Sequence, residues 1–362
     1  MLNFYVFNFI NLLPFLLVFG LCWIFFIKNN FFYIRVNATN ADVLKNSKVI
    51  KKFHSKLLVN YSLLVLVMLM LSIFFLKGIS DSFWWNHLYL TNFNQNLIIF
   101  ILLLSILIHL IVLNINVNNN INSIDYYFSI LNISVVIPFI FLSNSLYNFI
   151  FILEMISILI FYKFSVSKFW YRHPNDSWNK RNLLDRLVSR FYLNVLFYQY
   201  WVNFFSSVLI IISILNIMYI YGSTEWVFLN FINKINNNIS YFNSIEFSFI
   251  LWTIMFFGLF FKIGVSPIHL FKIEIYKGIP FISIFFYTTF YFTAYFVFFS
   301  ILIYQHITNF KSFFILPTTI FIIIGIIYII SLLFDTNFTK AFFAYSTIAN
   351  SLSFLCLLLS AL

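Results

Sequence analysis

The chain has 362 residues, of which 62% are hydrophobic and only 9% are charged. A soluble globular domain is about a quarter charged, so this composition excludes a soluble protein and indicates a polytopic helical membrane protein. Its apolar runs are too long and unbroken for the roughly 10-residue alternating strands of an outer-membrane barrel. The net charge of +11 does not indicate a nucleic-acid partner, because the basic residues lie between the apolar runs, where membrane topology explains them better.

We predict about ten membrane-spanning helices, each long enough to cross roughly 30 Å of hydrocarbon. They lie at 4–27, 57–76, 97–115, 124–143, 145–163, 193–221, 247–270, 279–304, 312–334 and 341–361. We divide the chain into N-terminal helices one to three (1–123), a group of helices four to eight (124–304) and helices nine and ten (305–362). The fold class is all-α.

The N-terminus carries neither a basic leader nor a small-residue cleavage site, so 4–27 is interpreted as a retained span. Most basic residues fall on one side of the predicted topology: they lie in 28–56, in the loop that begins at Lys163, and at Lys272, Lys277 and Lys340. The positive-inside rule then predicts an outward N-terminus.

One polar loop leaves two interpretations open. Apolar residues recur at helical spacing over 183–191, opposite Lys180, Arg186 and Arg190. The segment is either an amphipathic helix on the bilayer surface or an early start of the sixth span.

Several candidate site residues lie in one stretch, 256–280, FFGLFFKIGVSPIHLFKIEIYKGIP. A lysine in hydrocarbon costs roughly 2.5–3.5 kcal/mol and usually serves a function, which makes Lys262 a candidate site residue. Gly264 and Pro267 follow directly and predict a broken seventh helix, a device of membrane ion carriers. His269 either continues a proton path from Lys262 or caps carbonyls that the break frees; both interpretations remain open.

Glu154 is the acidic residue near the centre of a predicted span, and Lys262 is its basic counterpart. The proton affinity of each group depends on distance and hydration, so the pair is either a proton relay or a fixed ion pair between two helices. His109, inside the third span, is a packing residue or a proton site. The two cysteines lie in apolar segments, and no phosphate loop, metal motif or haem ligand set is present, so we expect no bound cofactor or metal.

Three motifs carry a family resemblance. FKIGVSPIHLFKIEIYKGIP resembles the signature of subunit 2 of the mitochondrial proton-pumping NADH dehydrogenase, respiratory complex I, a member of the antiporter-like subunits. LEMISILIFY at 153–162 resembles that family's fifth span and places Glu154 on its key glutamate. DTNFTKAFFAYSTIANS at 335–351, which contains Lys340, resembles a third family motif.

The resemblance implies an antiporter-like fold of inverted five-helix repeats, with Glu154 and Lys262 as the coupled pair of the first repeat. It also implies that NADH, FMN, iron–sulfur clusters and ubiquinone act elsewhere in the complex. Two departures stand out. Phe292 occupies the position of the family's eighth-span lysine, so a relay would need Tyr291, Thr293, Tyr295 or water. The chain also lacks the family's last four helices, which leaves the second repeat incomplete and predicts a separate chain that supplies them.

We therefore expect a proton-translocating subunit of complex I in the mitochondrial inner membrane, multi-pass, with its N-terminus in the intermembrane space and its basic loops in the matrix. The expected partners are other membrane-arm subunits, including antiporter-like subunit 4, and the lipid bilayer. The skew to Phe, Tyr, Ile and Asn, which have AT-rich codons, favours an organellar gene. The alternatives are a non-pumping structural scaffold of the same complex and a free-standing cation/proton antiporter.

Overall fold

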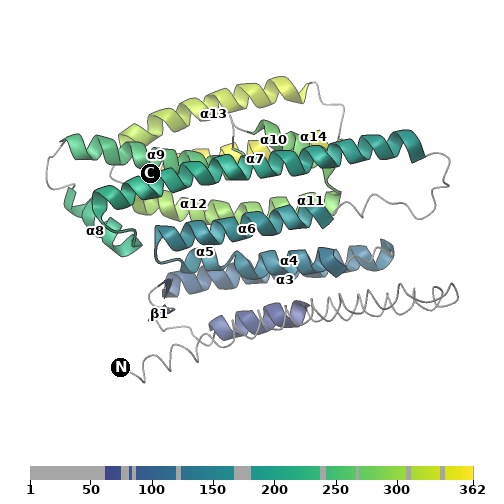
Figure 1. The fold of residues 1–362 in the computed structure, drawn as a ribbon, viewed down its shortest axis with the longest axis horizontal. Helices are drawn as coiled ribbons and strands as arrows, with labels where there is room; N and C mark the ends of the chain where they lie inside the picture. The colour runs from purple at the N-terminus through teal and green to yellow at the C-terminus, as the bar shows by residue number, and fades with distance from the viewer. Residues whose placement is uncertain are drawn as a thin grey trace. The chain divides into compact units, whose positions relative to one another are not determined.

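The computed structural model describes residues 62–74, 81–83, 87–119, 124–166, 181–236, 242–265, 269–306, 311–334 and 339–361 (Figure 1). Within these ranges the chain is almost entirely helical, as the composition predicts. It divides into two compact units, Met1–Ser143 and Asn144–Leu362. The predicted first span, 4–27, lies outside the described residues.

Among its described residues, the first unit begins with a helix over Ser62–Phe74. A small hairpin follows, formed by β1 (Asp81–Phe83) and β2 (Leu88–Leu90). Three further helices complete the described part of the unit: α3 (Asn92–Asn119), α4 (Ile124–Val136) and α5 (Phe139–Leu142). The strands pair antiparallel, with Asp81 opposite Leu90. Strands of three residues offer too few alternating positions to be predicted from sequence. Pro138, which cannot donate a backbone hydrogen bond, separates α4 from α5.

The second unit contains the helices that build the candidate site. They are α6 (Leu146–Val166), α7 (Arg181–Tyr221), α8 (Trp226–Asn236), α9 (Phe242–Ile263), α10 (Leu270–Gly278), α11 (Phe281–Phe286), η3 (Tyr287–Tyr291), α12 (Phe292–His306), α13 (Lys311–Leu333) and α14 (Thr339–Ala361). Helix α7 packs against α6, α9 and α10, and α14 packs against α10 and α13. The rings of Phe149 in α6 and Phe298 in α12 stack 4.7 Å apart, and Figure 1 shows these two helices side by side.

Four helical segments in the described part of the chain are long and apolar enough to cross a membrane. They are Asn92–Ile111, Leu146–Ser165, Tyr192–Tyr221 and Phe281–Ile303. Shorter apolar helices cover Ser62–Phe74, Phe128–Leu142, Ile250–Ile263 and Thr318–Leu333, and each falls within a predicted span. Helix α8 was not predicted. Helix α7 runs unbroken for 41 residues, which favours the early start of the sixth span over a separate surface helix.

Two irregularities interrupt the helices of the second unit. Helix α9 ends at Ile263, and the chain is helical again from Leu270, which agrees with the predicted break. The second irregularity is the π-helical segment η3 between α11 and α12, which has no counterpart in the sequence analysis. Segments of π-helix inside α-helices occur frequently at functional sites. Both irregularities lie beside the buried charges described next.

Candidate functional site

Helix α9 ends in a turn that only glycine adopts without strain. Gly264 has a φ of +72°, in the left-handed region. Its N–H donates to the Phe261 carbonyl over 3.2 Å, and the Val265 N–H donates to the Phe260 carbonyl over 3.2 Å. This pair of bonds is a Schellman motif, which closes a helix C-terminus. Lys262 therefore stands in the last turn of α9, where the helix dipole favours a positive charge.

Lys262 forms an ion pair with Glu154 across two helices. The Nζ atom of Lys262, on α9, donates to Glu154 Oε1, on α6, over 2.6 Å. The lysine side chain is fully buried, whereas 36% of the glutamate side chain is exposed within the described part of the chain. A buried cation that meets a partly accessible carboxylate can be either a fixed link or a point of proton exchange.

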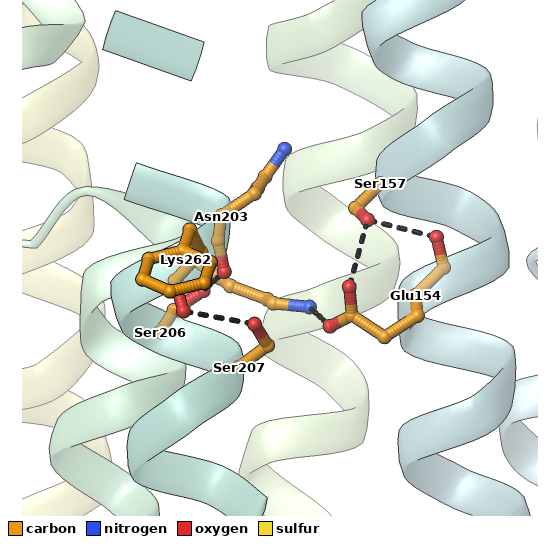
Figure 2. Close-up of polar contacts among 7 residues, drawn as sticks. Glu154, Ser157, Asn203, Ser206, Ser207 and Lys262 are labelled. Atoms are coloured by element: carbon orange, nitrogen blue, oxygen red, sulfur yellow. Dashed lines mark hydrogen bonds and ion pairs between the residues drawn. The ribbon is translucent and has the colours of Figure 1, made fainter. Parts of the chain in front are cut away.

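One serine contacts the pair, and two others lie beside the lysine side chain. Ser157 Oγ lies 3.3 Å from Glu154 Oε2 and donates to the Glu154 carbonyl over 2.8 Å. Figure 2 shows the Lys262 side chain extending past Ser206 and Ser207 of α7 toward Glu154. These two serines donate to carbonyls of their own helix, at Asn203 and Phe204. The pair therefore lies in a polar layer between α6, α7 and α9.

The other candidates on the predicted break lie on either side of α10. His269 directly precedes α10, is buried, and packs its ring against Tyr328 of α13 with the ring centroids 5.0 Å apart. Pro267 lies outside the described residues. Lys340, at the start of α14, donates to the Ile279 carbonyl over 2.8 Å, at the opposite end of α10 from the break.

His109 and Tyr291 have different environments. His109 belongs to the first unit, where its Nδ1 lies 2.8 Å from the Ser105 carbonyl, a contact typical of a packing histidine. Tyr291 is buried in η3 of the second unit, between the rings of Tyr287 at 4.9 Å and Tyr295 at 4.4 Å. Tyr291 and Tyr295 also lie within electrostatic reach of Glu154.

Two lysines that we placed among the basic loops from the sequence are buried in helices. Lys163 lies in the last turn of α6 with 1% exposure, and its Nζ is 3.2 Å from the centroid of the Phe286 ring. Lys272 lies in α10 with 0% exposure. That assignment was wrong for these two residues. Apolar neighbours on both sides of Lys272 were the available signal, since a lysine in a basic loop usually lies among polar residues.

The close approach at Gly264 leads to a testable prediction. A Cβ added there would lie 3.0 Å from Phe271 Cζ and 3.3 Å from Lys272 Cδ. Gly264→Ala is therefore expected to lower the stability by more than the roughly 1–2 kcal/mol of a left-handed alanine alone. Gly222→Ala is the matched control, because Gly222 has a φ of +70° and nothing within 4 Å. Thermal unfolding of the detergent-purified chain measures both, and equal losses would contradict the prediction.

No protein-family model matches the chain. An uncharacterized mitochondrial protein, ORF4 of Paramecium tetraurelia, is 37% identical over 83 residues, which make up 23% of this chain and 53% of that protein. The chain thus matches about half of the length of this relative.

Chains in solved structures of respiratory complexes share the fold. A chain in the structure of respiratory complex I from Thermus thermophilus with bound aureothin superposes with a TM-score of 0.57 at 13% identity, over 86% of this chain and 61% of that chain. A chain of the membrane-bound sulfane sulfur reductase, an archaeal respiratory membrane complex, superposes with a TM-score of 0.58 at 13% identity. The superposition covers 83% of this chain and 61% of that chain. This chain spans less than two thirds of either. It is a helical membrane protein that resembles membrane components of respiratory complexes in fold.

Proposed function

We propose that the chain is a proton-translocating membrane-arm subunit of respiratory complex I, similar to subunit 2, which couples NADH:ubiquinone oxidoreduction to proton pumping. The observation that carries the proposal is the 2.6 Å contact between Glu154 and the buried Lys262 at the end of a broken helix. The fold likeness to two respiratory complexes and the partial likeness to a mitochondrial protein support it.

The proposed step is a change in the strength of this ion pair. When Glu154 and Lys262 are in contact, each charge stabilises the other, and both protonation states are fixed. When the helix end carrying Lys262 moves away, the buried ammonium loses its counter-ion and releases its proton to water or a neighbouring group. We place this movement at the end of α9, because the helix stops at Gly264 and the Ile263 carbonyl is contacted by Lys272 rather than by a donor of its own helix.

The proposal also assigns parts of the chain to the two repeats and names a location and partners. We assign residues 124–304 to the first inverted repeat and α13 and α14 to the second. The proposed location is the mitochondrial inner membrane with the basic loops in the matrix, beside antiporter-like subunit 4. In this proposal electrons pass through NADH, FMN, iron–sulfur clusters and ubiquinone in other subunits, and this chain moves protons.

A non-pumping scaffold of the same complex is the second candidate. It is favoured by the absence of Asp, Glu, Lys, Arg and His between Lys277 and His306, where a proton route along α11 and α12 would run. The two candidates agree on assembly and differ on proton movement, so only a measurement of pumping separates them.

The proposed membership is tested on the native membrane. Solubilised membranes are run on a non-denaturing gel, stained for NADH dehydrogenase activity, and the active band is analysed by mass spectrometry. We expect peptides of this chain in that band at a level comparable to the other membrane subunits. A fully active band without this chain would overturn the proposal and favour the free-standing antiporter.

A further inference from the structure

Among the described residues, Lys272 is the most deeply buried charge that the proposed pair leaves unused. It has 0% exposure and lies between Phe271 and Ile273, which are each 7% exposed. Fully buried lysines are almost always paired with an acidic group or take part in function. The described part of the chain places no carboxylate within 4 Å of its Nζ; the ion pairs there are Lys262–Glu154 and Lys277–Glu274.

Within the part of the chain that the structure describes, two weak contacts hold the Lys272 amine instead. Its Nζ lies 3.4 Å from the carbonyl oxygen of Ile263 and 4.3 Å from the ring centroid of Phe292. A carbonyl and an aromatic face each stabilise an ammonium, but neither replaces the charge of a carboxylate. Lys272 can therefore exist with or without its proton without breaking an ion pair.

These contacts join Lys272 to both irregularities of the second unit. Ile263 directly follows Lys262 and is the last residue of α9, so its carbonyl is one that the helix end leaves without a helical partner. Phe292 directly follows the π-helical segment η3. A movement of the α9 end that separates Lys262 from Glu154 would also move the carbonyl that binds Lys272.

We propose that Lys272 is the second proton-carrying residue of the relay, an inference that rests on the proposed function. In the step, an N–H bond of the Lys262 ammonium breaks, and the proton, carried directly or by intervening water, forms an N–H bond on the neutral Lys272 amine. Lys262 becomes neutral as Lys272 becomes charged, and no electrons are transferred. The ring of Phe292 then contacts and stabilises the Lys272 ammonium through its aromatic face.

The route continues along α10. Tyr276 lies one turn beyond Lys272, is fully buried, and its hydroxyl oxygen lies 3.4 Å from Thr347 Oγ1 of α14. The Tyr276 ring also packs against Tyr287 of η3, with centroids 6.3 Å apart. Tyr276 therefore places a hydroxyl group on the helical turn that follows Lys272, where α10 meets α14.

The test separates proton transfer from a structural charge. Lys272→Arg keeps the positive charge, a donor for the Ile263 carbonyl and the contact with the Phe292 ring, but arginine does not release its proton in proteins. Lys272→Met removes the charge and keeps the length. Lys277→Arg, on the same helix in a partly exposed ion pair, is the matched control.

We expect both Lys272 variants to assemble and to lower proton translocation in membrane vesicles by about tenfold or more, while Lys277→Arg remains unchanged. Either variant that assembles and pumps at the unmodified rate would overturn the proposal. Failure of both to assemble would also overturn it, since the charge would then serve folding. Glu154→Gln, measured alongside, distinguishes the failures: if it still pumps, the proposed function itself is wrong.

Discussion

Replacement of Glu154 by glutamine is expected to reduce NADH-driven proton translocation by about 100-fold or more, because the amide can neither hold a proton for exchange nor balance Lys262. Lys262 is fully buried and 2.6 Å from the carboxylate that the variant removes. Proton uptake is measured with a pH-sensitive dye in vesicles, alongside the assembled complex on a non-denaturing gel. Glu154→Asp, which keeps a carboxylate, should retain measurable translocation.

The second ion pair of the unit supplies the control for this variant. Glu274 and Lys277 are also 2.6 Å apart, but they lie on one helix with side chains that are 29% and 27% exposed. Such pairs contribute only about 0–1 kcal/mol to stability. Glu274→Gln should therefore leave assembly and pumping unchanged. Normal pumping by an assembled Glu154→Gln complex would favour the non-pumping scaffold.

The second large effect is expected at Gly258, where α9 packs closely against α7. A Cβ there would lie 2.8 Å from Ile210 Cγ1 and 3.2 Å from the Ser206 carbonyl oxygen. Gly258→Leu is expected to cost about 1–3 kcal/mol, as overpacked side chains do. Gly258 precedes Lys262 by one turn on the same helix face, so separation of α7 and α9 should also displace Lys262 from Glu154.

Thermal unfolding of the purified chain and the pumping assay measure the two consequences separately. Ala349→Leu adds a comparable side chain to α14 at an exposed position, and should change neither. If Gly258→Leu matched this control in both stability and pumping, the close contact of α7 with α9 would not position the site.

The candidate pair was accessible to sequence reasoning for a physical reason. Glu154 is an acidic residue in the middle of an apolar run, and Lys262 stands beside a glycine that ends its helix. Two isolated opposite charges in hydrocarbon have a strong energetic reason to meet, because either alone would remain uncompensated. The structure places them in contact, while their role in proton transfer remains a prediction.

The burial of Lys163 and Lys272 has a weaker sequence signal, which for Lys272 consists only of its apolar neighbours. A lysine near the end of an apolar run can extend its stem toward the interface, so its position in the chain does not reveal the place of its amine. The partners of these two lysines, Phe286 and Phe292, lie more than a helix away in sequence and carry no charge that would mark a pairing. The π-helical segment η3 likewise could not be predicted, because no hydrophobic repeat in the sequence marks it.

The most direct test of the relay is proton translocation by a Lys262→Arg variant in vesicles, measured per NADH oxidised. Arginine keeps the charge and can bind the Glu154 carboxylate, but it does not give up its proton. We expect an assembled complex in which translocation falls about tenfold or more. An assembled Lys262→Arg complex that pumps as the unmodified one does would contradict the relay and identify the pair as a fixed link between α6 and α9.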